Sequence, residues 1–392
     1  MDIFEKCSQF TEAKTAIEQG YYPYFIPLNE NEGTEVTYQG RRLLMCGSNN
    51  YLGLTTHPKV KQAALDAIQR YGTSCTGSRF LNGTLELHER LERELADWVD
   101  KPAALVFSTG MQANFGAISA LVCRSDVVVL DKLDHASIID GARLSWGETK
   151  RFRHSDAKDL ERVLSGIPAD KGKLVVVDGL FSMEGDIAPL PELAPVCKKY
   201  GARLMVDDAH AMGVLGCGRG TAAHFGMTDE VDLVMSTFSK SFASLGGFVA
   251  GDADVIHYIK HHARSLIFSA SIPAPNAAAV LAALQVMREE PERVQRVNQI
   301  AERVRNELRR LGFNIGNSQT PVVPIIIGDD MRTLLTWKAL FEAGLFVNPV
   351  LSPAVPEGRQ LLRTSYMATH TDEQINRALE LFERVGRQMG VI

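Results

Sequence analysis

Short apolar runs that alternate with helical patterns are the feature of this sequence that most restricts its fold. The runs are rich in Val or Leu, and they span residues 103–108, 126–131, 173–179, 202–208, 231–236 and 246–251. Helical periods precede or separate several of them, including one that we expect to end at Gly72. Strands that are apolar on both faces belong to a parallel sheet that helices cover on both sides. The sequence therefore predicts an α/β fold with a mostly parallel sheet.

The pattern changes after Pro273, where helices begin to dominate. Residues 276–312 are nearly all helical, with a break near Pro291, and strands are predicted at 321–328 and 360–367. A chain of 392 residues, of which 45% are hydrophobic, can form two packed lobes. We therefore expect three parts, which are an N-terminal segment (1–50), a large domain (51–275) and a smaller C-terminal α+β domain (276–392).

Charge and composition exclude several classes of protein. The net charge is −5 and no Lys- or Arg-rich run is present, so we expect no nucleic-acid partner. The six cysteines lie far apart and form no CxxC pair, so we expect reduced thiols rather than disulfides or a metal site. The sequence has neither a signal peptide nor a run of roughly 20 apolar residues. We expect a cytoplasmic protein without a transmembrane segment, for which a peripheral membrane contact stays open.

Polar residues follow the predicted strands, at the edge where open α/β sheets bind their ligands. These residues are Gly110, His135, Ser182, Asp207, His210, Thr237, Ser239 and Lys240. Each one alone has an ordinary structural explanation, such as a helix cap for Asp207, a turn for Gly110 or a solvated loop for Lys240. Their joint position after five strands indicates a functional site.

Pyridoxal phosphate (PLP) chemistry fits this set of residues. PLP enzymes use a lysine amine for a Schiff base, an acid at the pyridinium nitrogen, a ring over the cofactor and donors for its phosphate. Lys240, Asp207 and His135 match the first three requirements. A helix that begins near Gly110, together with Thr237, suits a phosphate. Lys240 must be neutral to react, so we expect desolvation to lower its pKa.

Ordered motifs resemble the α-oxoamine synthase family of fold-type I PLP enzymes. They cover nearly the whole chain, as SNNYLGL (48–54), GSRFLNGT (77–84), HASIIDG (135–141), FSMEGDIAPL (181–190), VDDAHAMGVLG (206–216), TFSKS (237–241) and LLRTS (361–365). Around the lysine, most of the family carries a T-L-G-K-A type of sequence, whereas its serine palmitoyltransferase branch carries T-F-S-K-S, as this chain does. FRH (152–154), LFVN (345–348) and the terminal GVI also resemble that branch.

The resemblance implies a role for each residue of the site. Lys240 carries the cofactor, Asp207 contacts the pyridine nitrogen, and His135 stacks on the ring and helps to orient the substrate carboxylate. The remaining implied contacts are His210 and Ser182 at the phenolic oxygen, Thr237, Ser239 and the backbone amides of Gly110 and Met111 at the phosphate, and Arg363 at a substrate carboxylate. The implied catalytic residues are Lys240, His135, Asp207 and His210.

Two positions depart from the family's pattern. Met111 stands where Phe or Tyr is usual, which a backbone contact to the cofactor tolerates. Asp208 replaces a usual Glu, at a position outside the implied cofactor contacts.

The same resemblance implies a reaction and an assembly. The reaction is the decarboxylative condensation of L-serine with a long-chain acyl-CoA such as palmitoyl-CoA, giving 3-oxosphinganine, CoA and CO₂ in sphingolipid biosynthesis. The assembly is a homodimer with a shared active site, because residues 268–274 resemble the segment that a partner subunit contributes.

Two alternatives stay open. One is another α-oxoamine synthase that uses glycine or alanine, such as 8-amino-7-oxononanoate synthase or 2-amino-3-ketobutyrate CoA ligase, and the other is a non-catalytic scaffold subunit, against which the presence of Lys240 argues.

Overall fold

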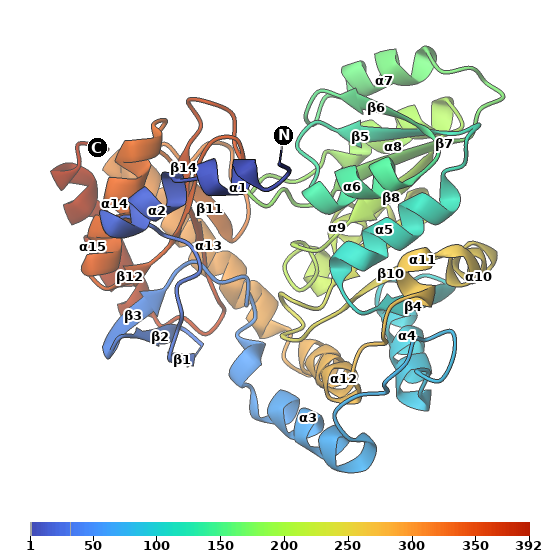
Figure 1. Cartoon of the computed structure of the whole chain (residues 1–392), viewed down its shortest axis with the longest axis horizontal. Helices are drawn as coiled ribbons and strands as arrows, with labels where there is room; N and C mark the ends of the chain where they lie inside the picture. The colour runs from blue at the N-terminus through green and yellow to red at the C-terminus, as the bar shows by residue number, and fades with distance from the viewer. Residues whose placement is uncertain (1, 32) are drawn as a thin grey trace.

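A mostly parallel sheet lies at the centre of the larger lobe of the computed structural model, which describes residues 2–31 and 33–392 (Figure 1). Its strand order is β4–β10–β9–β8–β7–β5–β6. Neighbours from β9 to β6 pair in parallel, and β10 runs antiparallel to β4 and β9. The strands are β4 (Ala103–Phe107), β5 (Val127–Asp131), β6 (Glu148–Phe152), β7 (Lys173–Asp178), β8 (Arg203–Asp207), β9 (Leu233–Thr237) and β10 (Gly247–Gly251).

Successive residues of each central strand pack into two separate cores, one on each face of the sheet. In β5, Val127 and Val129 pack into one core, while Val128 and Leu130 pack into the other. The first core is covered by α4 (Glu86–Trp98), α7 (Ala157–Ser165), α8 (Leu190–Lys199) and α12 (Ala274–Glu289). The second is covered by α5 (Gly110–Leu121), α6 (Ala136–Leu144), α10 (Ala253–His262) and α11 (Arg264–Ile267). The Val- and Leu-rich runs of the sequence therefore predicted this sheet correctly.

Strand β6 is the exception, because the sequence analysis did not predict it. Its sequence is ETKRF, and only Phe152 is buried. An edge strand needs few apolar residues, and charged side chains on it discourage pairing with other chains. This edge leads directly into His154, which contacts Asp131 and Asp186.

The smaller lobe joins the C-terminal part of the chain to its N-terminal segment, drawn in orange-red and blue in Figure 1. Strand β3 pairs in parallel with β12, so that Leu44 lies opposite Leu345. The strands of this lobe are β1 (Glu30–Asn31), β2 (Glu35–Tyr38), β3 (Arg41–Met45), β11 (Val322–Ile326), β12 (Leu345–Phe346), β13 (Asn348–Val350) and β14 (Leu361–Ser365). Its helices are α1 (Glu5–Gln9), α2 (Glu12–Glu18), α13 (Glu292–Leu311), α14 (Asp330–Glu342) and α15 (Asp372–Gln388).

Helix ends agree with the sequence where glycine or proline sets them. Helix α3 (Pro58–Tyr71) ends at Gly72, which has a φ of +76°, and the break near Pro291 separates α12 from α13. The boundaries at residues 50 and 275 stay predictions, and α12 itself packs in the core of the larger lobe. Within residues 2–31 and 33–392, no helix combines the length and apolar character that crossing a bilayer requires.

Candidate active site

A cavity of about 330 Å³ lies at the carboxyl ends of the central strands. Because neighbouring parallel strands end at the same edge of a sheet, residues far apart in the sequence meet there. The predicted residues that line the cavity are Gly110, Met111, His135, Ser182, Asp207, His210, Thr237, Ser239 and Lys240. Arg363 lies on β14 of the smaller lobe, beside this lining.

Lys240 lies on a tight loop that directly follows β9. The Phe238 N–H donates to the Gly246 carbonyl at 2.8 Å, and the Ser244 N–H donates to the Phe238 carbonyl at 2.8 Å. The fully buried Phe238 ring stacks on Phe248, with 5.9 Å between ring centres. Gly246 has a φ of +124°, and a Cβ there would lie 2.6 Å from the Phe238 ring. These contacts fix the backbone of Lys240 beside the cavity.

The Lys240 amine is held closer to neutrality than an ordinary lysine. Burial lowers its pKa to about 8, while the carboxylates of Asp207 and Asp178 favour the charged form and Arg363 disfavours it. A fraction of the amine is therefore neutral near pH 7, as a Schiff-base lysine requires.

Asp207 ends β8 with its side chain held by two donors. Its Oδ2 accepts a hydrogen bond of 2.7 Å from Asn114 Nδ2, and its Oδ1 accepts one of 2.9 Å from the Ala209 N–H. The residue is 3% exposed. A carboxylate fixed in this way can face a cationic nitrogen in the cavity without changing its rotamer.

His135 begins helix α6 beside the cavity. Its backbone N–H donates to Asp178 Oδ2 at 3.0 Å, and its Nδ1 accepts from the Ser137 N–H at 3.2 Å. Burial lowers the pKa of His135, which Lys240 lowers further and Asp207 raises. The ring is therefore mainly neutral near pH 7 and suits stacking on an aromatic ligand.

His210 lies on the loop after β8 and contacts Tyr51, which directly follows the N-terminal segment. The Tyr51 hydroxyl lies 2.7 Å from His210 Nδ1, and Tyr51 is fully buried. Burial holds the pKa of His210 well below its ordinary value, and the positive charges of Lys240 and Arg363 act in the same direction. His210 is therefore a neutral hydrogen-bonding group beside the lysine.

The first turn of α5 contributes Gly110 and Met111 to the lining of the cavity. Thr109 caps the helix by accepting from the Gln112 N–H at 3.1 Å. The backbone N–H groups of Gly110 and Met111 have no partner within the helix. A Cβ on Gly110 would lie 2.8 Å from Thr237 Cβ, so the helix and β9 approach too closely for a larger residue. A 12-residue helix that begins beside a threonine hydroxyl can bind an anion.

Arg363 connects the smaller lobe to this site. Its Nε donates to the Ser182 carbonyl at 2.6 Å, and its Nη2 donates to Asn49 Oδ1 at 2.9 Å. The side chain is buried, and its charge lowers the pKa of Lys240 and of His210. A guanidinium so close to the lysine can attract the carboxylate of a substrate.

The family model for class I and class II aminotransferases matches residues 42–382. The chain belongs to this family. It is 50% identical over 387 residues to a serine palmitoyltransferase of Sphingobacterium spiritivorum. This alignment covers 98% of this chain and 97% of that protein. It is 41% identical to an 8-amino-7-oxononanoate synthase of Treponema denticola, with 96% and 95% coverage. A solved structure of serine palmitoyltransferase with PLP has a TM-score of 0.97, 36% identity and 100% coverage of both chains.

Membership in the aminotransferase family confirms the predicted fold-type I architecture and PLP as the cofactor. The geometry of this chain fits that cofactor. Lys240 faces the cavity with a lowered pKa, Asp207 is fixed beside it, and the N-terminus of α5 lies close to Thr237. An amine, an acid and an anion site around one cavity are what PLP requires.

Four residues of this aminotransferase-family site were missed from the sequence: Tyr51, Asn114, Ser137 and Asp178. Asp178 ends β7 directly opposite Asp207 in the strand register, so the rule that found Asp207 also applies to it. Asn114 lies one turn into α5 and donates to both Asp207 and Ser137 Oγ. A buried amide inside a helix carries no sequence signal of its own.

We expect the apoprotein to form its Schiff base with PLP at a rate that rises with pH, half-maximally near the Lys240 pKa of about 8, because only the neutral amine attacks. Stopped-flow absorbance measures this rate, and Lys240→Ala is expected to give no Schiff-base band. A midpoint near the ordinary lysine pKa of about 10.4 would contradict the lowered pKa.

Gly110→Ala is expected to weaken PLP binding by about tenfold, equivalent to about 1.4 kcal/mol. The added methyl group would lie 2.8 Å from Thr237 Cβ and would push the first turn of α5 away from β9. Gly166→Ala is the matched control, because its nearest neighbour would be at an ordinary 3.6 Å. Equilibrium titration of both apoproteins measures the affinity, and equal affinities would refute the close packing.

Proposed function

We propose that this protein is a serine palmitoyltransferase, a PLP-dependent acyltransferase that condenses L-serine with palmitoyl-CoA to 3-oxosphinganine, CoA and CO₂. The observation that carries the proposal is the 50% identity, over nearly the whole chain, to a protein of that name. The site supports it, since Lys240, Asp207 and Arg363 lie together at the edge of the sheet. The T-F-S-K-S sequence around Lys240 is the local feature that favours serine.

Lys240 has two tasks in this proposal. When bound, PLP would withdraw electrons from the amino-acid Cα, so that bonds to this carbon could break heterolytically. Lys240 Nζ would hold the cofactor and would also accept the Cα proton of serine. A pKa of about 8 lets the same amine accept the proton and later return it. Asp207, held by Asn114 and Ala209, keeps the ring nitrogen protonated.

Arg363 and His135 orient the serine. The guanidinium pairs with the substrate carboxylate, and His135 lines the same cavity. The Cα of serine then bonds to the thioester carbon of the acyl-CoA while the C–S bond breaks, and CoA leaves as its thiolate, which takes a proton from solvent. The carboxylate leaves as CO₂, and a proton from Lys240 completes the new Cα–H bond. Atoms and charges balance without an external oxidant or reductant.

A second candidate is an α-oxoamine synthase that uses glycine or alanine. The 41% identity to an 8-amino-7-oxononanoate synthase favours it more than any other alternative. The scaffold alternative is weaker, since Lys240 and Asp207 are both present and converge on one cavity.

We further propose a cytoplasmic homodimer with a shared site. The six cysteines are free thiols, which suits a reducing compartment. Residues 268–274 lie against the start of α5, where Gln112 Nε2 donates to Ser269 Oγ at 2.9 Å. Phe268 is 73% exposed, and Leu81 is 76% exposed on the neighbouring loop. Exposed apolar side chains beside a catalytic cavity favour a partner subunit at that face.

The proposed reaction predicts selective turnover of L-serine with palmitoyl-CoA, measured by thiol release and product mass against glycine, alanine and shorter acyl-CoAs. Asp207→Asn is expected to retain PLP but to lose at least about 100-fold in kcat, because the electron sink is weakened. Preferred turnover of glycine or alanine would establish the second candidate instead. Absence of turnover with every amino acid would favour the scaffold.

The assembly predicts a dimeric mass by light scattering after size-exclusion chromatography. Phe268→Glu is expected to lower the dimer affinity by at least about tenfold, because it places a charge in an apolar contact. Leu335→Glu, at a half-exposed position of α14 in the smaller lobe, serves as the control. A monomeric wild-type protein would refute the shared site.

A further inference from the structure

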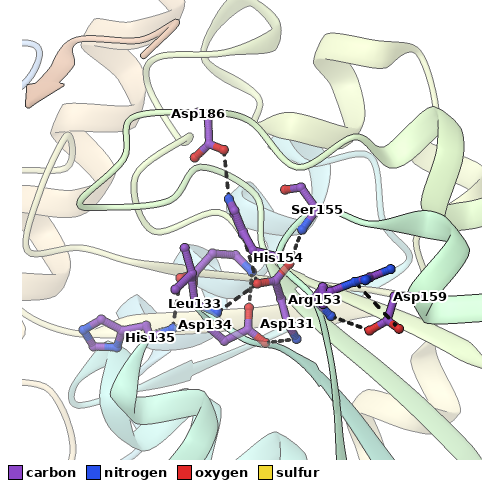
Figure 2. Close-up of polar contacts among 10 residues, drawn as sticks. Asp131, Leu133, Asp134, His135, Arg153, His154, Ser155, Asp159 and Asp186 are labelled. Atoms are coloured by element: carbon purple, nitrogen blue, oxygen red, sulfur yellow. Dashed lines mark hydrogen bonds and ion pairs between the residues drawn. The ribbon is translucent and has the colours of Figure 1, made fainter. Parts of the chain in front are cut away.

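His154 bridges the carboxylates of Asp131 and Asp186 (Figure 2). Its Nδ1 lies 3.0 Å from Asp131 Oδ1, and its Nε2 lies 2.9 Å from Asp186 Oδ2. Asp131 ends β5 and is 1% exposed, whereas Asp186 lies on the loop that follows β7. One side chain from beyond the edge strand β6 therefore connects two loops of the site.

Both ring nitrogens of His154 donate, because both partners are carboxylates. Burial by itself lowers the pKa of His154, but the hydrogen bonds and charges of Asp131 and Asp186 raise it to about 10. Glu184 is a third acid near the ring. The neighbouring Arg153 faces away, toward Asp159 in the first turn of α7 and toward Asp156, the N-cap of that helix. His154 is thus a cation throughout the physiological pH range.

The Asp131 end of this bridge leads to His135. Asp131 Oδ1 also accepts from the Leu133 N–H at 2.9 Å, and its backbone N–H donates to Asp134 Oδ2 at 2.8 Å. Asp134 Oδ1 accepts from the Asp178 N–H at 2.9 Å, and Asp178 Oδ2 in turn accepts from the His135 N–H at 3.0 Å. Every step of this chain is a hydrogen bond between buried or half-buried groups.

The Asp186 end leads to Arg363. The Phe181 N–H donates to the Asp186 carbonyl at 3.1 Å, which closes the loop that carries Ser182. The Phe181 ring also meets the His154 ring edge to face, with 4.4 Å between ring centres. From this loop the Ser182 carbonyl accepts from Arg363 Nε at 2.6 Å.

We propose that His154 is a positioning residue that clamps these two loops and so fixes His135 and Arg363 at the spacing that the serine carboxylate needs. The role rests on the proposed function, since it names the substrate group that the clamp serves. His154 touches neither substrate nor cofactor in this proposal. It acts through Asp131 and Asp186.

The test compares His154→Gln with Arg153→Gln in the PLP-loaded enzyme. His154→Gln removes the cation between the two carboxylates, whereas Arg153→Gln removes a neighbouring, largely exposed cation that faces α7. We expect His154→Gln to raise the KM for L-serine and its equilibrium Kd, followed by the change in cofactor absorbance, by about tenfold. The KM for palmitoyl-CoA is expected to stay within about twofold, as are all three constants of Arg153→Gln.

Proton linkage provides a readout that is independent of activity. The folded-state pKa of His154 is raised above its ordinary value, so its contribution to stability is complete below about pH 6.5 and is lost as the pH rises through about 10. The difference in Tm between wild type and His154→Gln is therefore expected to shrink between these values. The acidic groups that face His154 are Asp131, Asp186 and Glu184.

The outcomes separate the clamp from the proposed reaction. A lower Tm for His154→Gln with unchanged serine KM and Kd would make His154 purely structural and overturn the proposal. If that variant does not fold, Asp186→Asn, which keeps the side-chain shape, is expected to give the same rise in serine KM. If the wild type turns over glycine or alanine instead of serine, the proposed function fails, and the same comparison with that amino acid still tests the clamp.

Discussion

Buried carboxylates crowded at one edge of the sheet are the constraint on which the site depends. Asp134 and Asp178 lie near Asp207. Burial raises the pKa of Asp134 and of Asp178, and the charges of neighbouring acids raise it further. Such a cluster is stable only with donors and cations close by. Backbone N–H groups and Asn114 supply the donors, and Lys240 on one side and His154 on the other supply the cations. The same cluster limits how far burial can lower the pKa of Lys240, because two of its carboxylates favour the ammonium form.

The part of this site that could be predicted from the sequence follows from one rule, that polar residues after buried parallel strands meet at a single edge. Lys240 and Asp207 satisfy the rule, and they line the same cavity. Asp178 satisfies it equally and was overlooked, because a single acid at a strand end also reads as a turn residue. Asn114 lies in a helix of mostly apolar or small residues, and its contact with Asp207 depends on the packing of α5 against the sheet. No periodicity indicates such a contact.

The smaller lobe contributes Arg363, a residue whose position in the site could not be predicted from local sequence patterns. Arg363 was predicted from a motif alone, and its approach to Ser182 depends on how β14 is oriented toward the larger lobe. Asn49 of the N-terminal segment accepts from Arg363, and Tyr51, two residues further along the chain, contacts His210. These contacts join residues more than 150 positions apart. A pattern within one segment can therefore give the identity of such residues but not their distances.

The departure at Asp208 shows how closely the scaffold and the site are connected. Asp207 and Asp208 are adjacent and point to opposite sides of the strand end, so the first faces the cavity while the second is fully buried. Asp208 accepts from the Thr221 hydroxyl at 2.6 Å and from its N–H at 2.9 Å. A Cβ on Gly179 or Gly220 would lie 2.1 Å from its carboxylate oxygens, so the short aspartate fills a space that two glycines provide. A longer glutamate at 208 would require these neighbours to move, and any such movement would be transmitted through one peptide bond to Asp207.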